Sequence, residues 1–276
     1  MPARITFTTE TPTGPRSTSL VYERRGAGEP LLLLHGIGHH WQAWEPVLDV
    51  LATERDVIAV DLPGFGASDG LPEGCAYELS TVVSVLGAFC GAIGVERPHV
   101  AGNSLGGLLA LELGREKLVR SVTALSPAGF WTEAERRYAF GTLRGMRGAA
   151  LSLPVPVIGR LSRTAAGRTV LTSTIYARPA RRSPEAAVAE TLALRGATGF
   201  HQTLAAGRAV RWRDDLPSVP VTVAWGSRDR LLPHRQGVRA KRVLPGARLV
   251  RLPGCGHVPM NDDPALVARV ILDGSR

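Results

Sequence analysis

Short apolar runs alternate with longer amphipathic segments along much of the first half of the chain. Runs of this kind are typical of strands buried on both faces of a parallel sheet, and the segments between them have the spacing of helices that pack on such a sheet. The alternation predicts a βαβ arrangement. We expect strands at 31–34, 57–60, 98–101 and 119–125, and helices at 41–52, 78–93 and 105–118.

The segments on either side of this region complete the predicted sheet. Residues 4–9 and 18–24 alternate between apolar and polar positions, as half-exposed strands do, and predict an antiparallel start. After residue 218 the strand and helix pattern returns. We expect strands at 219–225 and 248–252, and helices at 234–243 and 262–272.

Between these two regions the strand pattern is interrupted. Residues 131–215 contain arginine-rich helical stretches, broken by prolines and glycines, with no convincing buried strand. This predicts a single α/β core formed by residues 1–130 and 216–276, into which 131–215 is inserted.

The net charge of +9 is concentrated in the same insertion. It has 14 arginines and 6 acidic residues, a balance of +8, whereas the rest of the chain has 19 basic and 18 acidic residues. Such asymmetry indicates a segment with a separate role. Solvated helix faces are the plainest interpretation, and an arginine that binds a substrate carboxylate, or contact with anionic lipid, is the sharper one. Nucleic-acid binding is disfavoured because no recognisable module accompanies the charge.

Composition limits the class of protein and the expected compartment. With 44% hydrophobic and 21% charged residues, the chain is neither disordered nor of low complexity. Residues 1–20 contain no apolar run of signal-peptide length, so a cytoplasmic location is expected. Cys75, Cys90 and Cys255 are too few for a disulfide framework and are expected to fill the core.

The most specific motif surrounds Ser104. Gly102-Asn103-Ser104-Leu105-Gly106 follows a predicted strand and opens a predicted helix. A turn this sharp strains its central residue and requires small neighbours two places away, which Gly102 and Gly106 supply. It would present the Ser104 hydroxyl as a nucleophile, whereas the alternative is a helix-capping serine among packing glycines.

A serine nucleophile needs a general base and an acid that orients the base. His257 lies in a glycine-rich loop after the last predicted strand, and Asp229 follows the strand before it. The order Ser104, Asp229, His257 is the one that the nucleophile-elbow architecture uses. We therefore predict a catalytic triad, although a loop histidine and a loop aspartate, taken singly, are more often surface groups.

The negative oxygen that forms on attack needs two preorganised donors. We assign them to the backbone N–H groups of Leu105 and of Ile37, which lies in the loop after the first parallel strand. Gly36 permits close approach there, and His35 is expected to support the loop by hydrogen bonding. No G-x-G-x-x-G follows this strand, which excludes a dinucleotide site.

From about residue 31 to its end, the chain resembles the α/β-hydrolase superfamily. The resemblance implies an α/β-hydrolase fold with a mostly parallel eight-stranded sheet, a helical cap at 131–215 and a mechanism without metal or cofactor. It also implies that Asp61 shapes a turn, which leaves Asp229 as the acid. The motifs that carry it are His35-Gly36, residues 61–68 (DLPGFGAS), the turn at Ser104, residues 226–229 (GSRD) and Gly256-His257.

Several reactions share this triad, and the residues favour one of them. Relatives that open epoxides or remove halides use an aspartate where this chain has Ser104. The Gly-Asn-Ser spelling resembles carbon–carbon bond hydrolases of ring-cleavage diketones, but those typically have a tryptophan where Val258 stands. We predict a carboxylesterase or lipase-like enzyme that acts on a small, apolar ester. Carbon–carbon hydrolysis, haloperoxidase-like perhydrolysis and a non-enzymatic small-molecule binding module remain alternatives.

For four residues that follow the oxyanion loop, the sequence predicts less specific roles. Trp41 and Trp44 either wall the acyl pocket or, as is commoner for such a pair, pack in the core. His39 and His40 are expected to be polar loop residues at the mouth of the pocket.

Overall fold

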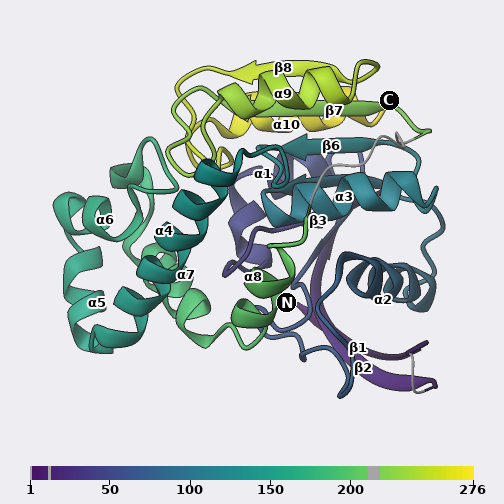
Figure 1. The fold of residues 1–276 in the computed structure, drawn as a ribbon, viewed down its shortest axis with the longest axis horizontal. Helices are drawn as coiled ribbons and strands as arrows, with labels where there is room; N and C mark the ends of the chain where they lie inside the picture. Colours follow the sequence, from purple (N-terminus) through teal and green to yellow (C-terminus); the bar gives the residue numbers. More distant parts are fainter. Residues whose placement is uncertain (1, 12–13, 211–217) are drawn as a thin grey trace.

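A computed structural model describes residues 2–11, 14–210 and 218–276 of the chain. Its centre is an eight-stranded sheet in the order β1-β2-β4-β3-β5-β6-β7-β8 (Figure 1). The β1–β2 and β2–β4 pairs are antiparallel and the other five pairs are parallel, so the predicted mostly parallel sheet with an antiparallel start is confirmed. The strands are β1 (Ala3–Thr9), β2 (Arg16–Arg25), β3 (Pro30–Leu34), β4 (Asp56–Val60), β5 (His99–Asn103), β6 (Val122–Leu125), β7 (Val221–Gly226) and β8 (Arg248–Leu252).

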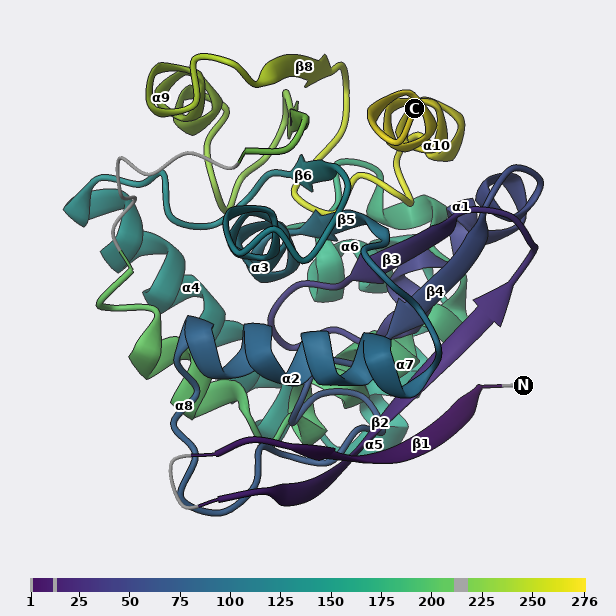
Figure 2. The ribbon, with the colours of Figure 1, turned by 90° about the vertical axis from the view of Figure 1, so that its right-hand side faces the viewer.

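Helices cover both faces of the sheet (Figure 2). On β3, Leu32 and Leu34 pack into one apolar cluster together with α2, α3 and α9, while Leu31 and Leu33 pack into a second cluster with α1 and α10. Because successive strand residues point to opposite faces, a short apolar run can serve both layers. These helices are α1 (Glu45–Ala52), α2 (Leu79–Ala92), α3 (Leu105–Arg115), α9 (Arg235–Val243) and α10 (Pro264–Gly274).

The predicted helix over 41–52 is split into two pieces. Trp41–Trp44 forms a 3-10 turn, η1, and α1 begins at Glu45. Pro46 explains the break, because a proline is favoured in the first turn of a helix and would disrupt its interior. The predicted strand over 119–125 is also shorter, since β6 begins only at Val122.

The described part of the insertion, 131–210, is helical and lies between β6 and β7 in the chain. Its first and longest helix starts with a capping box, in which Thr132 and Glu135 bond each other's backbone N–H groups. Residues 211–215 of the predicted cap lie outside the described part. The helices are α4 (Glu133–Ser152), α5 (Val155–Ser162), α6 (Ala165–Thr172), η2 (Pro179–Arg181), α7 (Pro184–Gly196) and α8 (Phe200–Ala206).

Three further observations concern the described residues as a whole. None of their helices is long and apolar enough to cross a membrane. Within the same residues, no cluster of histidine, cysteine, aspartate or glutamate side chains is arranged to hold a metal ion. Cys90 and Cys255 are buried and Cys75 is half-buried, and all three are free thiols.

Candidate active site

Ser104 occupies the tight turn between β5 and α3. Its backbone has φ 57° and ψ −114°, a conformation that a residue with a side chain rarely adopts. The two glycines beside it have no room for a side chain: a Cβ on Gly102 would lie 2.0 Å from the Gly106 carbonyl oxygen, and one on Gly106 would lie 2.0 Å from that of Leu34. The turn predicted from the sequence is therefore present, and both glycines are required by contact distance.

The strained conformation is held by the backbone hydrogen bonds of Ser104 itself. Its N–H donates to the Leu125 carbonyl at 3.0 Å, and its carbonyl accepts from Leu108 at 3.0 Å and from Ala128 at 3.1 Å. Ser104 is thus tied to β6, to the helix that follows it and to the loop after β6. Such multiple ties are what an unfavourable φ needs in order to persist.

His257 and Asp229 form a buried pair next to this turn. His257 Nδ1 lies 2.8 Å from Asp229 Oδ2, and both residues are less than a tenth exposed. The other carboxylate oxygen, Oδ1, accepts from the backbone N–H groups of Leu231 at 2.9 Å and Leu232 at 2.8 Å. A carboxylate held in this way fixes the ring of the histidine, keeps the proton on Nδ1 and leaves Nε2 as a base.

His257 Nε2 is buried and has no hydrogen-bond partner among the described residues. His257 and Ser104 line the same small cavity. In unliganded enzymes the bond between nucleophile and base is often long and tightens only when substrate binds. The arrangement thus supplies a free basic nitrogen beside a presented hydroxyl.

Asn103 is a residue of the site that sequence reasoning did not assign. Its amide nitrogen donates to the carbonyl oxygen of His257 at 2.9 Å and to that of Leu125 at 3.1 Å. It therefore fixes the histidine loop directly to the residue before Ser104. The asparagine in the Gly-Asn-Ser spelling was the available signal, but its partner is 154 positions away in the sequence.

Ile37 and Leu105 bring two backbone N–H groups to the side of Ser104. Neither N–H donates a hydrogen bond to another described residue, and Leu105 is the first residue of α3, where N–H groups are unpaired by geometry. Both residues line the larger cavity together with Ser104. A Cβ on Gly36 would lie 3.3 Å from the Cβ of Ser104, so the loop lies close to the serine.

His35 braces the loop that carries Ile37. Its Nε2 accepts from the Leu62 N–H at 3.0 Å, so Nδ1 carries the proton and donates to the Gly36 carbonyl at 2.7 Å. Burial lowers the pKa of His35 to about 3, despite that bond to the carbonyl. The histidine is therefore neutral, as this bonding requires.

Asp61, the rival acid, is engaged elsewhere. Its two oxygens accept from the backbone N–H groups of Trp41 at 2.6 Å and Ala67 at 2.8 Å, which shapes the turn after β4. Burial raises the pKa of Asp61 to about 6, against the opposing effect of these two bonds. No bond joins it to His257 among the described contacts.

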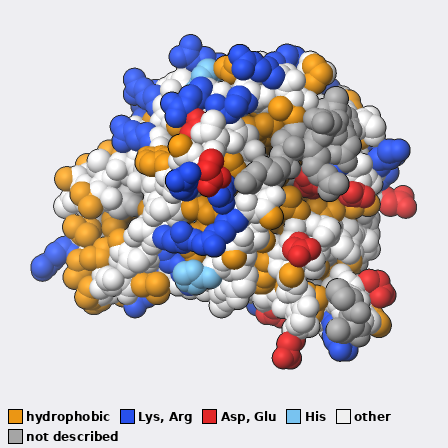
Figure 3. Space-filling view, viewed as in Figure 1, with side chains coloured by type: hydrophobic (Ala, Val, Ile, Leu, Met, Phe, Trp, Pro, Cys, Tyr) orange, Lys and Arg blue, Asp and Glu red, His pale blue; other side chains and the backbone are white. Residues whose placement is uncertain are grey.

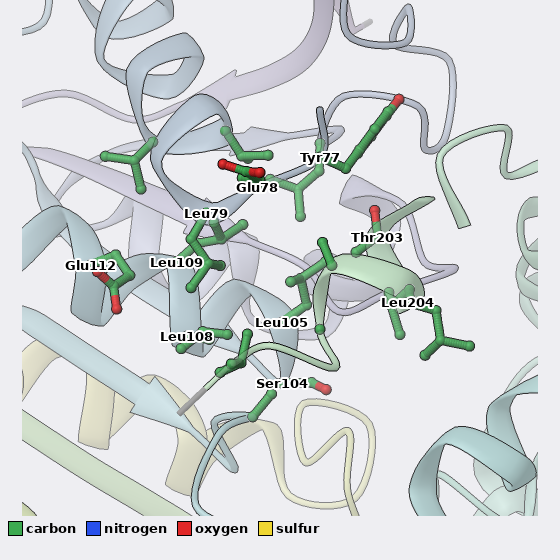
Figure 4. Close-up of a pocket in the computed structure, with 18 of the residues that line it drawn as sticks. Tyr77, Glu78, Leu79, Ser104, Leu105, Leu108, Leu109, Glu112, Thr203 and Leu204 are labelled. Carbon is green, nitrogen blue, oxygen red and sulfur yellow. The ribbon is translucent and has the colours of Figure 1, made fainter. Parts of the chain in front are cut away.

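Two cavities meet at Ser104. The larger, of about 820 Å³, is lined mainly by apolar residues of α2, α3, α4 and α8 and extends from Ser104 to Tyr77 and Glu78 (Figure 4). The smaller, of about 180 Å³, lies between the end of the sheet and the helices of the insertion. His257 lines this smaller cavity and does not line the larger one. Ser104 therefore has apolar space on one side and the base on the other.

A family model described as the alpha/beta hydrolase fold matches residues 29–264. The chain belongs to this family. It is 30% identical over 261 residues to uncharacterized protein Rv2715 of Mycobacterium tuberculosis, a match that covers 87% of this chain and 73% of the relative. It is 29% identical over 256 residues to a pimeloyl-acyl-carrier-protein methyl ester esterase of Nitrosomonas europaea, which covers 89% and 95% respectively.

Two further matches widen the comparison. A 2-hydroxy-6-oxo-2,4-heptadienoate hydrolase of Pseudomonas putida is 38% identical over 89 residues, 31% of this chain and 32% of the relative. The crystal structure of a membrane phospholipase A, described as a bacterial virulence factor, superposes with a TM-score of 0.75 at 25% identity. That match covers 99% of this chain and 87% of the other. The chain is thus a hydrolase-fold protein with relatives named for ester and for dienoate hydrolysis.

Two expectations about the loop after β3 are settled by burial. Trp41 and Trp44 pack in the apolar cluster below the sheet and line neither cavity, so they are core residues. His39 and His40, expected as polar loop residues at the mouth of the pocket, are both less than a tenth exposed, and His39 lines the small cavity. Burial, with neighbouring positive charge, lowers the pKa of His39 to about 3 and that of His40 to about 4. The helices of the insertion cover them, which a local pattern does not reveal.

The arginines of the insertion have several environments. Arg147 donates to the carbonyl oxygens of Leu194 and Ala197 at 2.8 Å, and Arg182 is buried in an ion pair with Glu190. Figure 3 shows other basic side chains on the surface over α9 and the start of α4, and apolar side chains over α5 and α6. Among described arginines, Arg115 of α3 is the one that lines either cavity. Neither cavity thus presents an arginine of the insertion to a substrate carboxylate.

Proposed function

We propose that this α/β-hydrolase-fold protein is a serine hydrolase that cleaves carboxylic esters. The observation that carries the proposal is the buried His257–Asp229 pair, 2.8 Å apart, beside a serine with the strained backbone of a nucleophile elbow. A hydrogen-bonded acid and base next to a presented hydroxyl is the arrangement that activates serine. An esterase and a phospholipase among the relatives support the ester as the bond that is cleaved.

The reaction follows from the positions of these groups. Ser104 Oγ attacks the ester carbonyl carbon while its proton passes to His257 Nε2, and Asp229 stabilises the resulting imidazolium. The carbonyl oxygen becomes an oxyanion that accepts from the N–H groups of Ile37 and Leu105. The ester C–O bond then breaks, and His257 returns the proton to the departing alcohol oxygen.

The acyl group remains on Ser104 Oγ until water removes it. A water molecule gives one proton to His257 Nε2 and attacks the acyl carbon, forming a second oxyanion at the same two N–H groups. The bond to Ser104 breaks, the serine recovers the proton and a carboxylic acid leaves. Each cycle consumes one ester and one water and needs neither metal nor cofactor.

The insertion at 131–215 acts in this proposal as the cap over the site. Leu143 of α4 lines both cavities, and residues of α6, α7 and α8 line one or the other. Closing such a site excludes water and shapes the pocket. The substrate is a small molecule, and the cap decides which ester is accepted.

Carbon–carbon hydrolysis is the second candidate, supported by the 38% identity to the dienoate hydrolase over 89 residues. The small cavity argues against it, because the unpartnered oxygen of Glu190 that lines it is an acceptor and offers no donor to the carboxylate of an acidic diketone. Comparing kcat/KM for p-nitrophenyl butyrate with that for a vinylogous ring-cleavage diketone decides between the two. We expect turnover of the ester and none of the diketone.

Variants of the three side chains test the mechanism itself. Ser104→Ala should lower kcat for p-nitrophenyl butyrate by at least about 10⁴-fold, and Asp229→Asn and His257→Gln by about 10³-fold or more. Ser152→Ala, an exposed serine of α4, is the matched control and should keep wild-type activity. Retained activity in Ser104→Ala would overturn the assignment of the nucleophile.

A further inference from the structure

Three buried polar side-chain atoms around the small cavity lack partners. His39 Nδ1, Glu190 Oε2 and His257 Nε2 make no hydrogen bond with any described residue, and all three residues line the cavity. A buried polar atom without a partner is unfavourable, and in a site it indicates where a ligand bonds. The mechanism uses His257 Nε2. It makes no use of the other two atoms.

Glu190 has one oxygen engaged and one spare. Its Oε1 accepts from the Tyr176 hydroxyl at 2.7 Å and from Arg182 Nε at 2.7 Å, and the three side chains are buried. The guanidinium of Arg182 therefore neutralises the charge of the carboxylate and fixes its orientation. Oε2 is left as a preorganised acceptor. It can accept a hydrogen bond from a neutral donor, because Arg182 already balances the charge of the carboxylate.

His39 supplies a second polar group on the same cavity. Its ring is neutral, with a pKa of about 3, so one ring nitrogen donates and the other accepts. A hydroxyl group can donate to Glu190 and can donate to or accept from His39, whichever tautomer is present. A carboxylate would find no donor at Glu190 Oε2, and an ammonium would meet a carboxylate whose charge Arg182 already balances. The cavity is therefore suited to hydroxyl groups.

The position of the base decides which half of an ester lies here. His257 must protonate the departing alcohol oxygen, and it lines the small cavity and not the large one. The alcohol half therefore occupies the small cavity, which leaves the large one for the acyl half.

The large cavity has the form of an acyl-chain site. Its apolar wall follows one face of α3 through Leu105, Leu108 and Leu109, α2 supplies Leu79, and Glu112 lies beyond the leucines (Figure 4). Residues at this spacing lie on one side of a helix, and the α3 residues from Leu105 to Arg115 that line it span about 15 Å at the helical rise. Its volume of about 820 Å³ is far larger than a short acyl group needs.

We propose that the substrate is an ester of a medium- or long-chain fatty acid with a small polyhydroxy alcohol such as glycerol, whose free hydroxyls bind Glu190 and His39. This inference rests on the proposed function, since it assigns the two halves of the ester to the two cavities.

The test compares two esters that share an acyl chain and differ in the alcohol. Glyceryl monooctanoate carries the free hydroxyls, and propyl octanoate has the same carbon skeleton without them. The wild-type protein should prefer the glyceryl ester in kcat/KM by about tenfold or more, because a site with unpaired polar atoms rejects an analogue that cannot bond them. A preference below about twofold would overturn the proposal.

Variants assign the preference to the two side chains. His39→Leu loses no described side-chain hydrogen bond, so it should fold, and it should reduce the glyceryl preference by about threefold to tenfold. Glu190→Gln should do the same, with circular dichroism to confirm folding. Thr191→Val is the matched control: it lines the same cavity, but its hydroxyl already bonds the Ala187 carbonyl at 2.8 Å. An unchanged ratio in His39→Leu, or an equal loss in Thr191→Val, would contradict the assignment.

Ethers that cannot be hydrolysed test recognition of the alcohol hydroxyls independently of ester hydrolysis. 1-O-octylglycerol should bind at least about tenfold more tightly than octyl propyl ether, with the fluorescence of Trp131 in the large cavity as the signal. Tighter binding without ester turnover would support the hydroxyl site at Glu190 and His39 but reject ester hydrolysis, the proposed function. Turnover of p-nitrophenyl esters with equal binding of both ethers would support ester hydrolysis and reject the hydroxyl site at Glu190 and His39.

Discussion

The backbone around Ser104 is packed so closely that one added carbon atom at position 106 would clash. A Cβ at position 106 would lie 2.0 Å from the Leu34 carbonyl oxygen and 2.7 Å from that of His35, and these are backbone atoms that cannot swing aside. The loop that carries Ile37 follows directly, so any shift of His35 moves a donor of the proposed oxyanion site. Stability and activity are therefore coupled at Gly106.

Gly106→Ala should lower the free energy of unfolding by about 3 kcal/mol, as overpacking does, and should reduce kcat for p-nitrophenyl butyrate at least about tenfold. Urea unfolding and steady-state kinetics measure the two effects. Gly145→Ala in α4 is the control, since nothing lies within 4 Å of a Cβ there; it should be neutral or slightly stabilising. Equal behaviour of the two variants would mean that crowding at position 106 is unimportant.

The buried neutral histidines predict how stability depends on pH. His35, His39 and His40 have folded-state pKa values of about 3, 3 and 4, below the ordinary value of 6.5. Below about pH 6.5 these three histidines therefore bind protons in the unfolded chain but stay neutral in the folded protein. Their stabilising contribution is complete above about pH 6.5 and is lost as pH falls toward the folded-state values. Asp61, with its pKa raised to about 6, acts in the opposite direction but involves a single proton.

Urea unfolding at about pH 7.5 and about pH 5 should show a lower free energy at the acid value, by up to about 2 kcal/mol for each histidine. His40→Gln should show a smaller acid loss than the wild type. His201→Gln, at an exposed position of α8, controls for removal of a histidine as such. If His40→Gln and the wild type lose the same stability between the two pH values, His40 is not neutral in the folded protein.

At the scale of elements, α4 is joined to the sheet layer by a buried carboxylate. Glu135, which is 5% exposed, caps its own helix through the Thr132 N–H and pairs with Arg235 and Arg239 of α9. These contacts lie at the point where the insertion leaves the core after β6, so they set the position of the first insertion helix.

Glu135→Gln should lower the free energy of unfolding by about 2 kcal/mol, less than a fully buried pair because Arg235 is 67% exposed. Hydrogen exchange should speed up in the first turn of α4 before it does so in the sheet strands. Glu133→Gln, an exposed neighbour in the same turn, should change stability by less than about 0.5 kcal/mol. A uniform increase in exchange across the protein would argue against a local anchor.

The elements differ in how well the sequence predicts them, for physical reasons. All eight strands were expected near their observed places, since the buried parallel strands need apolar residues on both faces and the half-exposed β1 and β2 alternate between apolar and polar positions. Within 131–210 the sequence predicted helices without their bounds. Two contacts matter most at the site: the hydrogen bond of Asn103 to His257 and the ion pair of Arg182 with Glu190. Both depend on segments that meet only in the folded structure. The burial of His39 likewise depends on helices far along the chain, so no local pattern shows it.

At the scale of the whole molecule, the insertion and the sheet together divide the site into two compartments. The sheet and its loops supply Ser104, His257 and Asp229, and the helices of 131–210 supply much of the lining that separates apolar space from the small polar cavity. In the proposed function, the chemistry is thus a property of the core, while selection of the substrate is a property of the insertion. This division explains why the sequence predicts the reaction class more readily than the ester.

A fluorophosphonate probe followed by peptide mass mapping tests the central claim most directly. Such probes phosphonylate an activated serine and spare ordinary ones, so the result depends on the base and the oxyanion donors acting together. We predict a single adduct on Ser104, absent in Ser104→Ala and formed much more slowly in His257→Gln. No adduct, or an adduct on another serine while Ser104 stays unmodified, would contradict the account.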